Sequence, residues 1–210
     1  EALAHGVFID INPAPTLFHS VRPDLQQTVI EAIYALREQG RERIAFIGGE
    51  GHMMGSHVFA RDPRTFAFDE WARLLGMPTD GHVYASGPFT VDNGRDQAEA
   101  LLDAHAEAMP DAILVAADPL AVGVIQALVA RGVRIPDEVA VLSIDNLEVC
   151  QYTAPTLSSY AIERSELAET ALMLLSDAIV GRFRHKHHVL LSTHLVPRQS
   201  FIPLEDTPRY

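Results

Sequence analysis

The stretch of the sequence that most suggests chemistry is the glycine-rich loop "GEGHMMG" at 49–55. It follows an apolar run and loosely matches G-x-G-x-x-x-G, and a glycine loop between a strand and a helix often holds a phosphate. The next helix start, however, is Asp62-Pro63, seven residues after Gly55, and a carboxylate there repels phosphate. No Gly-Lys-Ser/Thr sequence follows the loop. The sequence therefore predicts that this loop borders a binding cleft and does not bind a nucleotide.

The histidines suggest a metal site at first sight, because "RHKHH" at 184–188 holds three of them. Alternate residues of a strand point to opposite faces, and no Asp, Glu or Cys is adjacent to complete a ligand set. The run is better interpreted as a basic turn that enters a strand. His52 and His57 of the glycine loop are likewise interpreted as loop residues, although His52 could contact a ligand.

A catalytic set cannot be assembled from the nucleophilic side chains. Ser143, Ser158 and Ser159 lie in no G-x-S-x-G elbow, and Cys150 has no activating base near it in sequence. We therefore predict that the protein is not an enzyme and needs no metal or cofactor.

Composition limits the partners. The chain has 210 residues and a formal net charge of −12, so it repels phosphate backbones and is not expected to hold DNA or RNA itself. Its single cysteine suits a reducing cytoplasm. The start of the sequence does not resemble a signal peptide, and the longest apolar runs are far too short to span a bilayer. A cytoplasmic protein without a membrane partner is expected.

Strands alternate with helices along most of the chain, which predicts an α/β protein with an open parallel sheet. The predicted strands are 43–47, 82–86, 112–116, 138–144 and 187–196, with a further short strand within 152–162. Helices are predicted to start at Asp24 and at Asp62, and over 93–108, from Asp118 to Gly132 and over 164–180. A short helical piece is expected at 146–151.

Ligands of such sheets bind outside the carboxyl ends of the strands. That rule selects the loop 48–62, the segment Gly87–Phe89, Asp118, and Asp145 with Asn146. These residue types suit a polyol. Carboxylates accept hydrogen bonds from its hydroxyls, an arginine fork donates to them, and an aromatic ring packs against its apolar face.

Six segments in order resemble the effector-binding core of the LacI/GalR family of bacterial transcription regulators. They are "LREQGRERIAFIGG" 36–49, "RTFAF" 64–68, "SGPFTVDNG" 86–94, the stretch 111–146 from "DAILVAADP" to "LSIDN", "YTAPTLSSY" 152–160 and "LVPRQS" 195–200. "RTFAF" has Ala67 where the family motif has glycine. The resemblance covers about residues 6–203.

The resemblance implies a periplasmic-binding-protein-like fold with two lobes of parallel sheets flanked by helices. Residues 1–19 and 157–182 would belong to an incomplete N-terminal lobe, and 20–148 with 188–203 to the C-terminal lobe. The family's helix-turn-helix DNA-binding domain is not found in this chain, so operator DNA would be bound through another domain. A sugar-like effector and a homodimer are also implied.

The resemblance further assigns ligand roles to five residues at the lobe interface. Arg64 resembles the ligand-anchoring arginine, Phe89 the aromatic that packs on the ligand, and Asp145 the carboxylate that accepts from ligand hydroxyls. Asp10 resembles a contact from the N-terminal lobe, and Asp118 lies one position after a family contact, which is Ala117 here. Arg198 resembles a residue near the lobe crossovers and is interpreted as structural.

Each of these side chains also has a purely structural interpretation. Asp118 could cap the helix that begins at Pro119, and Asp145 could cap the piece 146–151. Arg64 could be solvated and Phe89 could belong to the core, while Asp62 is interpreted only as a helix cap.

Two other functions are open at this level. A sugar-binding protein of a transport system shares the two-lobed fold, although it would need a secretion signal and the ending "LVPRQS" favours the regulators. A nucleotide-dependent enzyme rests on the glycine loop alone.

Overall fold

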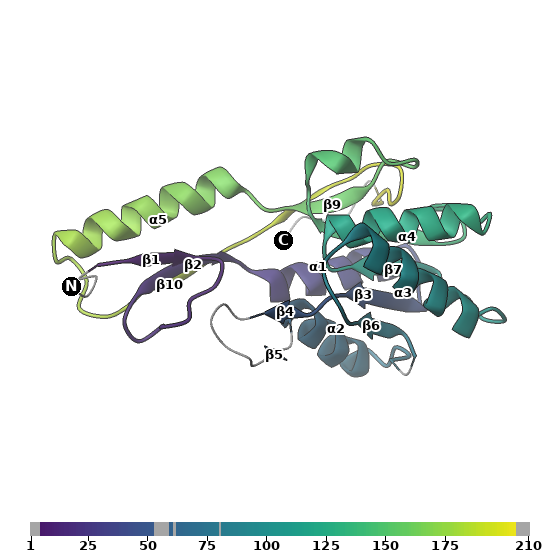
Figure 1. The fold of residues 1–210 in the computed structure, drawn as a ribbon, viewed down its shortest axis with the longest axis horizontal. Coiled ribbons are helices and arrows are strands. Elements are labelled where there is room, and N and C mark those ends of the chain that lie inside the picture. The colour runs from purple at the N-terminus through teal and green to yellow at the C-terminus, as the bar shows by residue number, and fades with distance from the viewer. Residues whose placement is uncertain (1–4, 53–58, 61, 80, 205–210) are drawn as a thin grey trace.

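A computed structural model of the chain describes residues 5–52, 59–60, 62–79 and 81–204, and it consists of two units of unequal size (Figure 1). The larger unit holds a six-stranded sheet in the order β11-β9-β8-β7-β3-β6. Its strands are β3 (Ile44–Gly48), β6 (Val83–Ala85), β7 (Ala112–Val115), β8 (Ala140–Asp145), β9 (Ser158–Ala161) and β11 (His194–Val196). All neighbours are parallel except β11, which runs antiparallel to β9.

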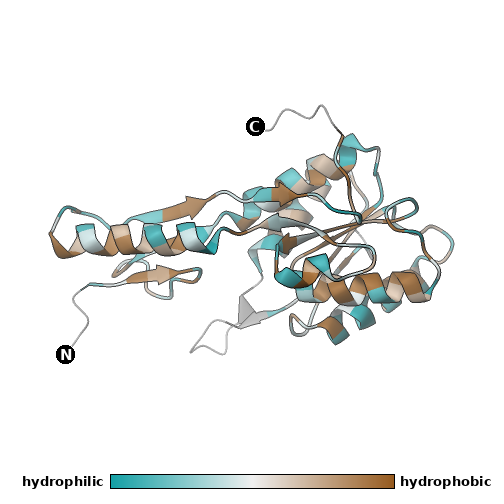
Figure 2. Ribbon diagram, turned by 90° about the horizontal axis from the view of Figure 1, so that it is seen from above, coloured by the Kyte–Doolittle hydropathy of each residue, from teal (hydrophilic) through white to brown (hydrophobic). Residues whose placement is uncertain are grey.

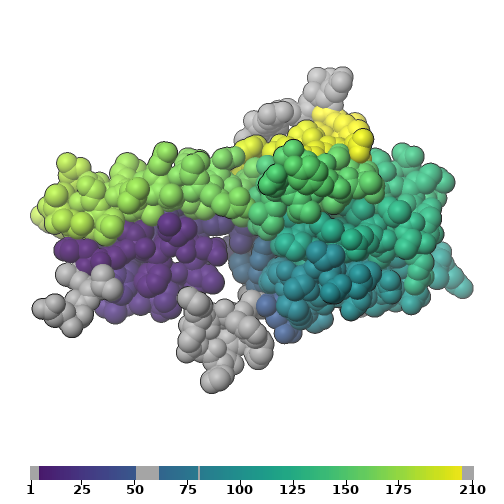
Figure 3. All heavy atoms as spheres, turned by 45° about the horizontal axis from the view of Figure 1, so that its top comes forward, coloured from purple at the N-terminus to yellow at the C-terminus, as the bar shows by residue number. Residues whose placement is uncertain are grey.

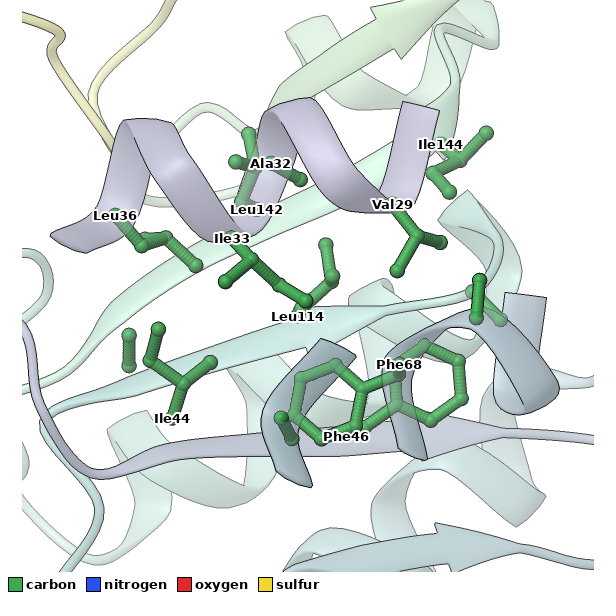
Figure 4. Packing of buried hydrophobic residues seen from close by; sticks show 14 of the residues in the cluster. Val29, Ala32, Ile33, Leu36, Ile44, Phe46, Phe68, Leu114, Leu142 and Ile144 are labelled. Atoms are coloured by element: carbon green, nitrogen blue, oxygen red, sulfur yellow. The ribbon is translucent and has the colours of Figure 1, made fainter. Parts of the chain in front are cut away.

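Two pairs of helices cover the faces of this sheet. α1 (Leu25–Glu38) and α2 (Pro63–Leu74) pack on one face, where Phe46 stacks on Phe68 with ring centroids 5.0 Å apart (Figure 4). α3 (Val91–Ala104) and α4 (Asp118–Ala130) pack on the other face. Figure 2 shows the apolar strands of the larger unit between these helices. The continuous apolar runs of the central strands follow from burial on both faces.

Close contact between α3 and α4 depends on two glycines. A Cβ on Gly94 would lie 2.1 Å from the carbonyl oxygen of Leu120, and one on Gly123 would lie 2.0 Å from that of Val91. Only glycine permits such an approach of two backbones. The approach brings together the N-terminal ends of both helices, and the loops that precede them carry Phe89 and Ala117.

The smaller unit consists of a three-stranded parallel sheet, β1-β2-β10, and one helix, α5 (Arg164–Ile179). Its strands are β1 (Val7–Ile9), β2 (His19–Pro23) and β10 (His188–Leu191). Val21 of β2 packs with Leu167, Ala171 and Leu174 of α5 in a small core. Other apolar side chains of α5, among them Leu172 and Ile179, are exposed. Figure 3 shows this unit extending from one side of the larger one.

Three connections join the two units, between β2 and α1, between β9 and α5, and between β10 and β11. Hydrogen bonds join the β2–α1 connection to the β10–β11 connection. The backbone N–H of Asp24 donates to the carbonyl of Leu191 at 2.8 Å, and the hydroxyls of Thr28 and Thr193 are 2.9 Å apart.

The α/β class and the flanked parallel sheets predicted from the sequence are confirmed, with two corrections to the elements. The predicted strand 187–196 is two strands, because the chain passes from one unit to the other at Ser192-Thr193. His19–Pro23 forms β2, which the sequence did not predict, since a segment with His19, Arg22 and Pro23 has no apolar pattern.

The pairing of these strands also differs from the lobe boundaries expected from the sequence. Residues 20–23 and 188–191, expected in the C-terminal lobe, pair with β1 in the smaller unit. Residues 158–161, expected in the N-terminal lobe, form β9 of the larger sheet. Across the described ranges, none of the helices combines the length and apolar character needed to cross a membrane.

Candidate functional site

Arg64 lies in the first turn of α2, and its guanidinium group is almost fully enclosed. Its Nε and Nη2 donate to the two carboxylate oxygens of Asp62 at 2.8 and 2.7 Å, and its Nη1 donates to the carbonyl of Ala116 at 2.7 Å. The side chains of Arg64 and Asp62 are only 12% and 8% exposed. Burial alone would lower the pKa of Arg64, but Asp62, Asp145 and Asp10 raise it above its ordinary value. Arg64 therefore stays charged.

Phe89 packs against Arg64, with the guanidinium carbon 4.9 Å from the ring centroid, in cation–π contact. The turn that presents the ring is built from its neighbours. Asn93 donates through Nδ2 to the carbonyls of Ser86 and Pro88, both at 2.7 Å. Gly49 lies beneath the ring, where a Cβ would approach it to 3.1 Å. Phe89 also touches both hydrophobic cores, so it is partly a core residue as well as a site residue.

Asp145 ends β8 in a strained conformation, with φ at 114°. Its carboxyl group is near Arg64, Asp118 and Arg164. Burial raises the pKa of Asp145 to about 7; Asp118 adds to this rise, while Arg64 and Arg164 oppose it. Positive φ in a residue other than glycine, together with a perturbed pKa, marks functional sites more often than ordinary surface. Asp145 does not cap the turn at Glu148–Gln151, which begins after Leu147.

Asp118 lies beneath the site and has no exposed surface. Its Oδ1 accepts from the hydroxyl of Ser159 at 2.7 Å, and its Oδ2 accepts from the backbone N–H of Leu147 at 2.6 Å. The interpretation of Asp118 as a helix cap is wrong, since Ala117 is the cap residue and no side chain caps α4. Its carboxylate instead links the start of α4 to β9 and to the loop after β8, and positions the segment after Asp145.

Asp10 is the site residue contributed by the smaller unit. It follows β1 with φ at 72°, its backbone N–H donates to the carbonyl of Val21 at 2.9 Å, and it is exposed. Its charge interacts with Arg64 of the larger unit. The site thus draws charged groups from both units.

The remaining polar residues near the site have structural roles. Arg198 donates to the carbonyl of Leu157 and to Oδ1 of Asn146 at 2.8 and 2.7 Å, which agrees with its structural interpretation. Ser158 bonds to the backbone of Phe201 and of Arg198. Burial, followed by the charge of Asp118, raises the pKa of the Cys150 thiol well above its ordinary value, so this thiol is not an activated nucleophile.

The described part of the glycine loop, residues 49–52, does not lead directly into a helix. Gly51–His52 (β4) pairs antiparallel with Phe59–Ala60 (β5), so a hairpin separates β3 from α2. The N-terminus of α2 is capped by Asp62, whose Oδ1 accepts from the backbone N–H of Arg64 at 2.9 Å. His57 lies outside the described residues, as does the side chain of His52.

The "RHKHH" run forms the predicted turn into a strand. The backbone N–H of His187 donates to Nδ1 of His19 at 3.0 Å, and His188 Nδ1 bonds with the Ser20 hydroxyl at 2.8 Å. These bonds hold β10 beside β2. Within the ranges that the structure describes, no three His, Cys, Asp or Glu side chains gather as a metal site requires.

A surface hollow of about 730 Å³ lies elsewhere, between the C-terminal ends of α3 and α4. Its charged residues include Arg43, Arg131 and Glu138, which pair with Asp111, Asp103 and Arg134. Because these charges are already paired, the hollow offers less to a polar ligand than the group around Arg64.

Of the five candidate residues, the structure brings Arg64, Phe89 and Asp145 together, with Asp10 facing them and Asp118 beneath. Sequence reasoning missed Arg164, an exposed residue at the start of α5, and the second role of Asp62. The spacing Asp-Pro-Arg was the only available signal for the Asp62–Arg64 pair.

The fold and this interface group define a periplasmic binding protein-like domain, and residues 33–201 match the family of that description. The chain is 38% identical over 205 residues to the HTH-type transcriptional regulator LacR of Lactobacillus helveticus, covering 98% of this chain and 61% of the relative. It is 34% identical to the HTH-type transcriptional regulator GanR of Bacillus subtilis, covering 93% and 59%.

Comparison with a solved structure leads to the same family. The LacI family transcriptional regulator of Arthrobacter sp. FB24 in complex with lactose has a TM-score of 0.79 at 27% identity, over 92% of this chain and 70% of that one. The chain belongs to the LacI/GalR family of transcriptional regulators and comprises the family's effector-binding domain. It spans about three fifths of the length of the curated relatives, which are named as regulators and not as enzymes.

Proposed function

We propose that this chain senses a sugar or glycoside bound between its two units and thereby controls the binding of operator DNA by a helix-turn-helix domain of the whole regulator. The whole protein would act in the cytoplasm as a homodimer. The observation that carries the proposal is the convergence of Arg64 from the first turn of α2, Phe89 from the loop before α3 and Asp145 from the end of β8.

The chemistry of these groups suits a polyol. Arg64 offers directed N–H donors, the carboxylate of Asp145 can accept from two hydroxyls, and the Phe89 ring can pack on the apolar face of a sugar. The lactose found in the related Arthrobacter regulator is a ligand of this class.

Control of DNA binding requires that the sugar bind one arrangement of the two units more tightly than another. Asp10 and Arg64 lie on different units, and their charges interact. A ligand between them would favour the arrangement in which both contact it, and the three connections near Asp24, Glu163 and Thr193 would bend.

A thermal-shift panel of sugars, nucleobases and nucleotides tests the proposal, because a ligand that binds only the folded state raises the Tm. We expect lactose, galactose or glucose to raise the Tm of the wild-type chain. Arg64→Lys should abolish the shift, since one ammonium group cannot replace the fork. Arg43→Lys, at the opposite end of the sheet, should keep it.

Stabilisation by NAD or ATP alone would show that the proposal is wrong. So would an equal response of the Arg64 and Arg43 variants. A monomer in light scattering of the full-length regulator would contradict the homodimer.

A further inference from the structure

Asp62 does more than begin a helix. Its Oδ1 accepts from the backbone N–H of Arg64 at 2.9 Å, a capping bond that Ser or Asn could supply equally well. The same carboxylate also accepts from Nε and Nη2 of Arg64 at 2.8 and 2.7 Å. Two parallel bonds between a carboxylate and a guanidinium group fix the plane of both. A cap alone does not require this second interaction.

The bonds of Arg64 determine what it can still offer to a ligand. A guanidinium group has five N–H donors. Asp62 takes the Nε–H and one Nη2–H, and the carbonyl of Ala116 takes one Nη1–H at 2.7 Å. Within the part of the chain that the structure describes, two donors remain, one on each terminal nitrogen, and the Phe89 ring packs against the guanidinium group. Arg64 is therefore a pair of fixed donors and not a mobile cation.

The charge around Arg64 is unfavourable for an anion. Asp62 lies directly against the guanidinium group and offsets its charge, and it occupies the helix N-terminus where a phosphate could otherwise bind. Among the described residues, those that interact electrostatically with Arg64 or Asp145 are four carboxylates and two guanidinium groups, namely Asp10, Asp62, Asp118, Asp145, Arg64 and Arg164. An uncharged sugar can use both donors and acceptors here, whereas a phosphate meets an excess of negative charge.

We propose that Asp62 is a specificity-determining residue, which holds Arg64 as a neutralised pair of donors and thereby selects an uncharged sugar over a phosphorylated one. This inference rests on the proposed sugar-sensing function. Asp62 acts through Arg64, so its role is that of a positioning residue that also sets the charge of the site.

Asp62→Asn separates this role from capping. Asparagine is an equally good cap, so α2 should still begin at Pro63, while the loss of the buried ion pair should lower the Tm. However, its single amide oxygen can keep the cap and the bond from Nε, while its NH₂ group faces Nη2, so the bond from Nη2 and the charge pairing are lost. Asp24→Asn is the matched control, because Asp24 caps α1 by accepting from the N–H of Gln27 at 3.1 Å and pairs with none of the described arginines. Both variants remove one negative charge.

Calorimetric titrations with lactose, galactose and glucose, each beside its 6-phosphate, measure the preference. We expect the wild type and Asp24→Asn to bind at least one uncharged sugar about tenfold or more tightly than its phosphate. Asp62→Asn should weaken binding of that sugar about tenfold and reduce the preference by a similar factor. In ¹⁵N NMR, the Arg64 Nη2–H protons should exchange with water more rapidly in Asp62→Asn than in the wild type.

The outcomes distinguish the two proposals. If the wild type binds a sugar but Asp62→Asn keeps the same preference, or the Arg64 Nη2–H protons exchange equally slowly in both, the role of Asp62 is wrong and sugar sensing stands. A wild type that prefers the phosphorylated sugar also overturns the role of Asp62. If no sugar or sugar phosphate binds the wild type, sugar sensing fails and this inference fails with it.

Discussion

Replacing Asp145 by Asn should make the protein more stable at neutral pH and leave it nearly unchanged in acid. The reason is that burial raises the pKa of Asp145 from its ordinary 3.8 to about 7 in the folded protein. The folded state therefore holds this proton more tightly than the unfolded state does. The stability that comes from the proton is fully present below pH 4 and is lost as the pH rises toward 7.

The size of the effect follows from the two pKa values. The shift is about 3 units, and each unit corresponds to about 1.4 kcal/mol, so the upper bound is ~4 kcal/mol. Asp145 is only partly buried, and water screens it, so we expect roughly 1–3 kcal/mol. Asparagine tolerates positive φ and keeps a similar shape, so the substitution tests the charge and not the backbone.

Urea unfolding followed by the fluorescence of Trp71, the only tryptophan, measures the difference at pH 4, 5, 6, 7 and 8. The free energy of unfolding of Asp145→Asn minus that of the wild type should grow from pH 4 to about 7 and then level off. Other titrating groups cancel in this difference if the m-values agree. A difference that does not change with pH would refute the reasoning, because Asp145 would then titrate alike in both states.

Two further substitutions test the other residues of the site. Asp118→Ala should lower the free energy of unfolding by roughly 2–5 kcal/mol in urea titrations, since the Ser159 hydroxyl and the Leu147 N–H lose their buried acceptor; a loss below about 0.5 kcal/mol would contradict this structural role. Phe89→Ala should raise the Kd for the preferred sugar about 10- to 100-fold in calorimetry, because a ring worth ~1.5–3 kcal/mol of contact is removed; an unchanged Kd would exclude Phe89 from the site.

Much of the larger unit could be predicted from the sequence because its signals are local. Asp24 and Asp62 cap α1 and α2 as expected, and the left-handed Gly40, Gly76 and Gly132 lie just beyond the ends of α1, α2 and α4. The buried run at β3 also lies where its apolar residues predicted it. Caps, left-handed glycines and unbroken apolar runs each act within a few residues, so one sequence suffices to find them.

The smaller unit and the details of the site were less predictable. β2 has no apolar pattern, and its partner β10 lies about 170 residues away in the chain, so β2 is not recognisable from its own residues, whereas β10 lies within the predicted strand 187–196. Asp118 could be placed at a helix start, but its actual partners come from β9, which holds Ser159, and from the loop after β8, which holds Leu147. Side-chain hydrogen bonds between remote segments depend on how the elements pack, which sequence spacing does not encode.

The sequence by itself determined the α/β class and the sheet edge that carries Arg64, Phe89 and Asp145, because these depend on local order and periodicity, while the resemblance of six segments pointed to the family. Only the tertiary structure decided how each charge is used. Asp62 and Asp118 look alike in the sequence, because each directly precedes a proline at a predicted helix start. In the structure, Asp62 forms an ion pair with Arg64, whereas Asp118 is buried beneath Asp145. The difference arises because a carboxylate takes its role from the donors that packing brings within about 3 Å.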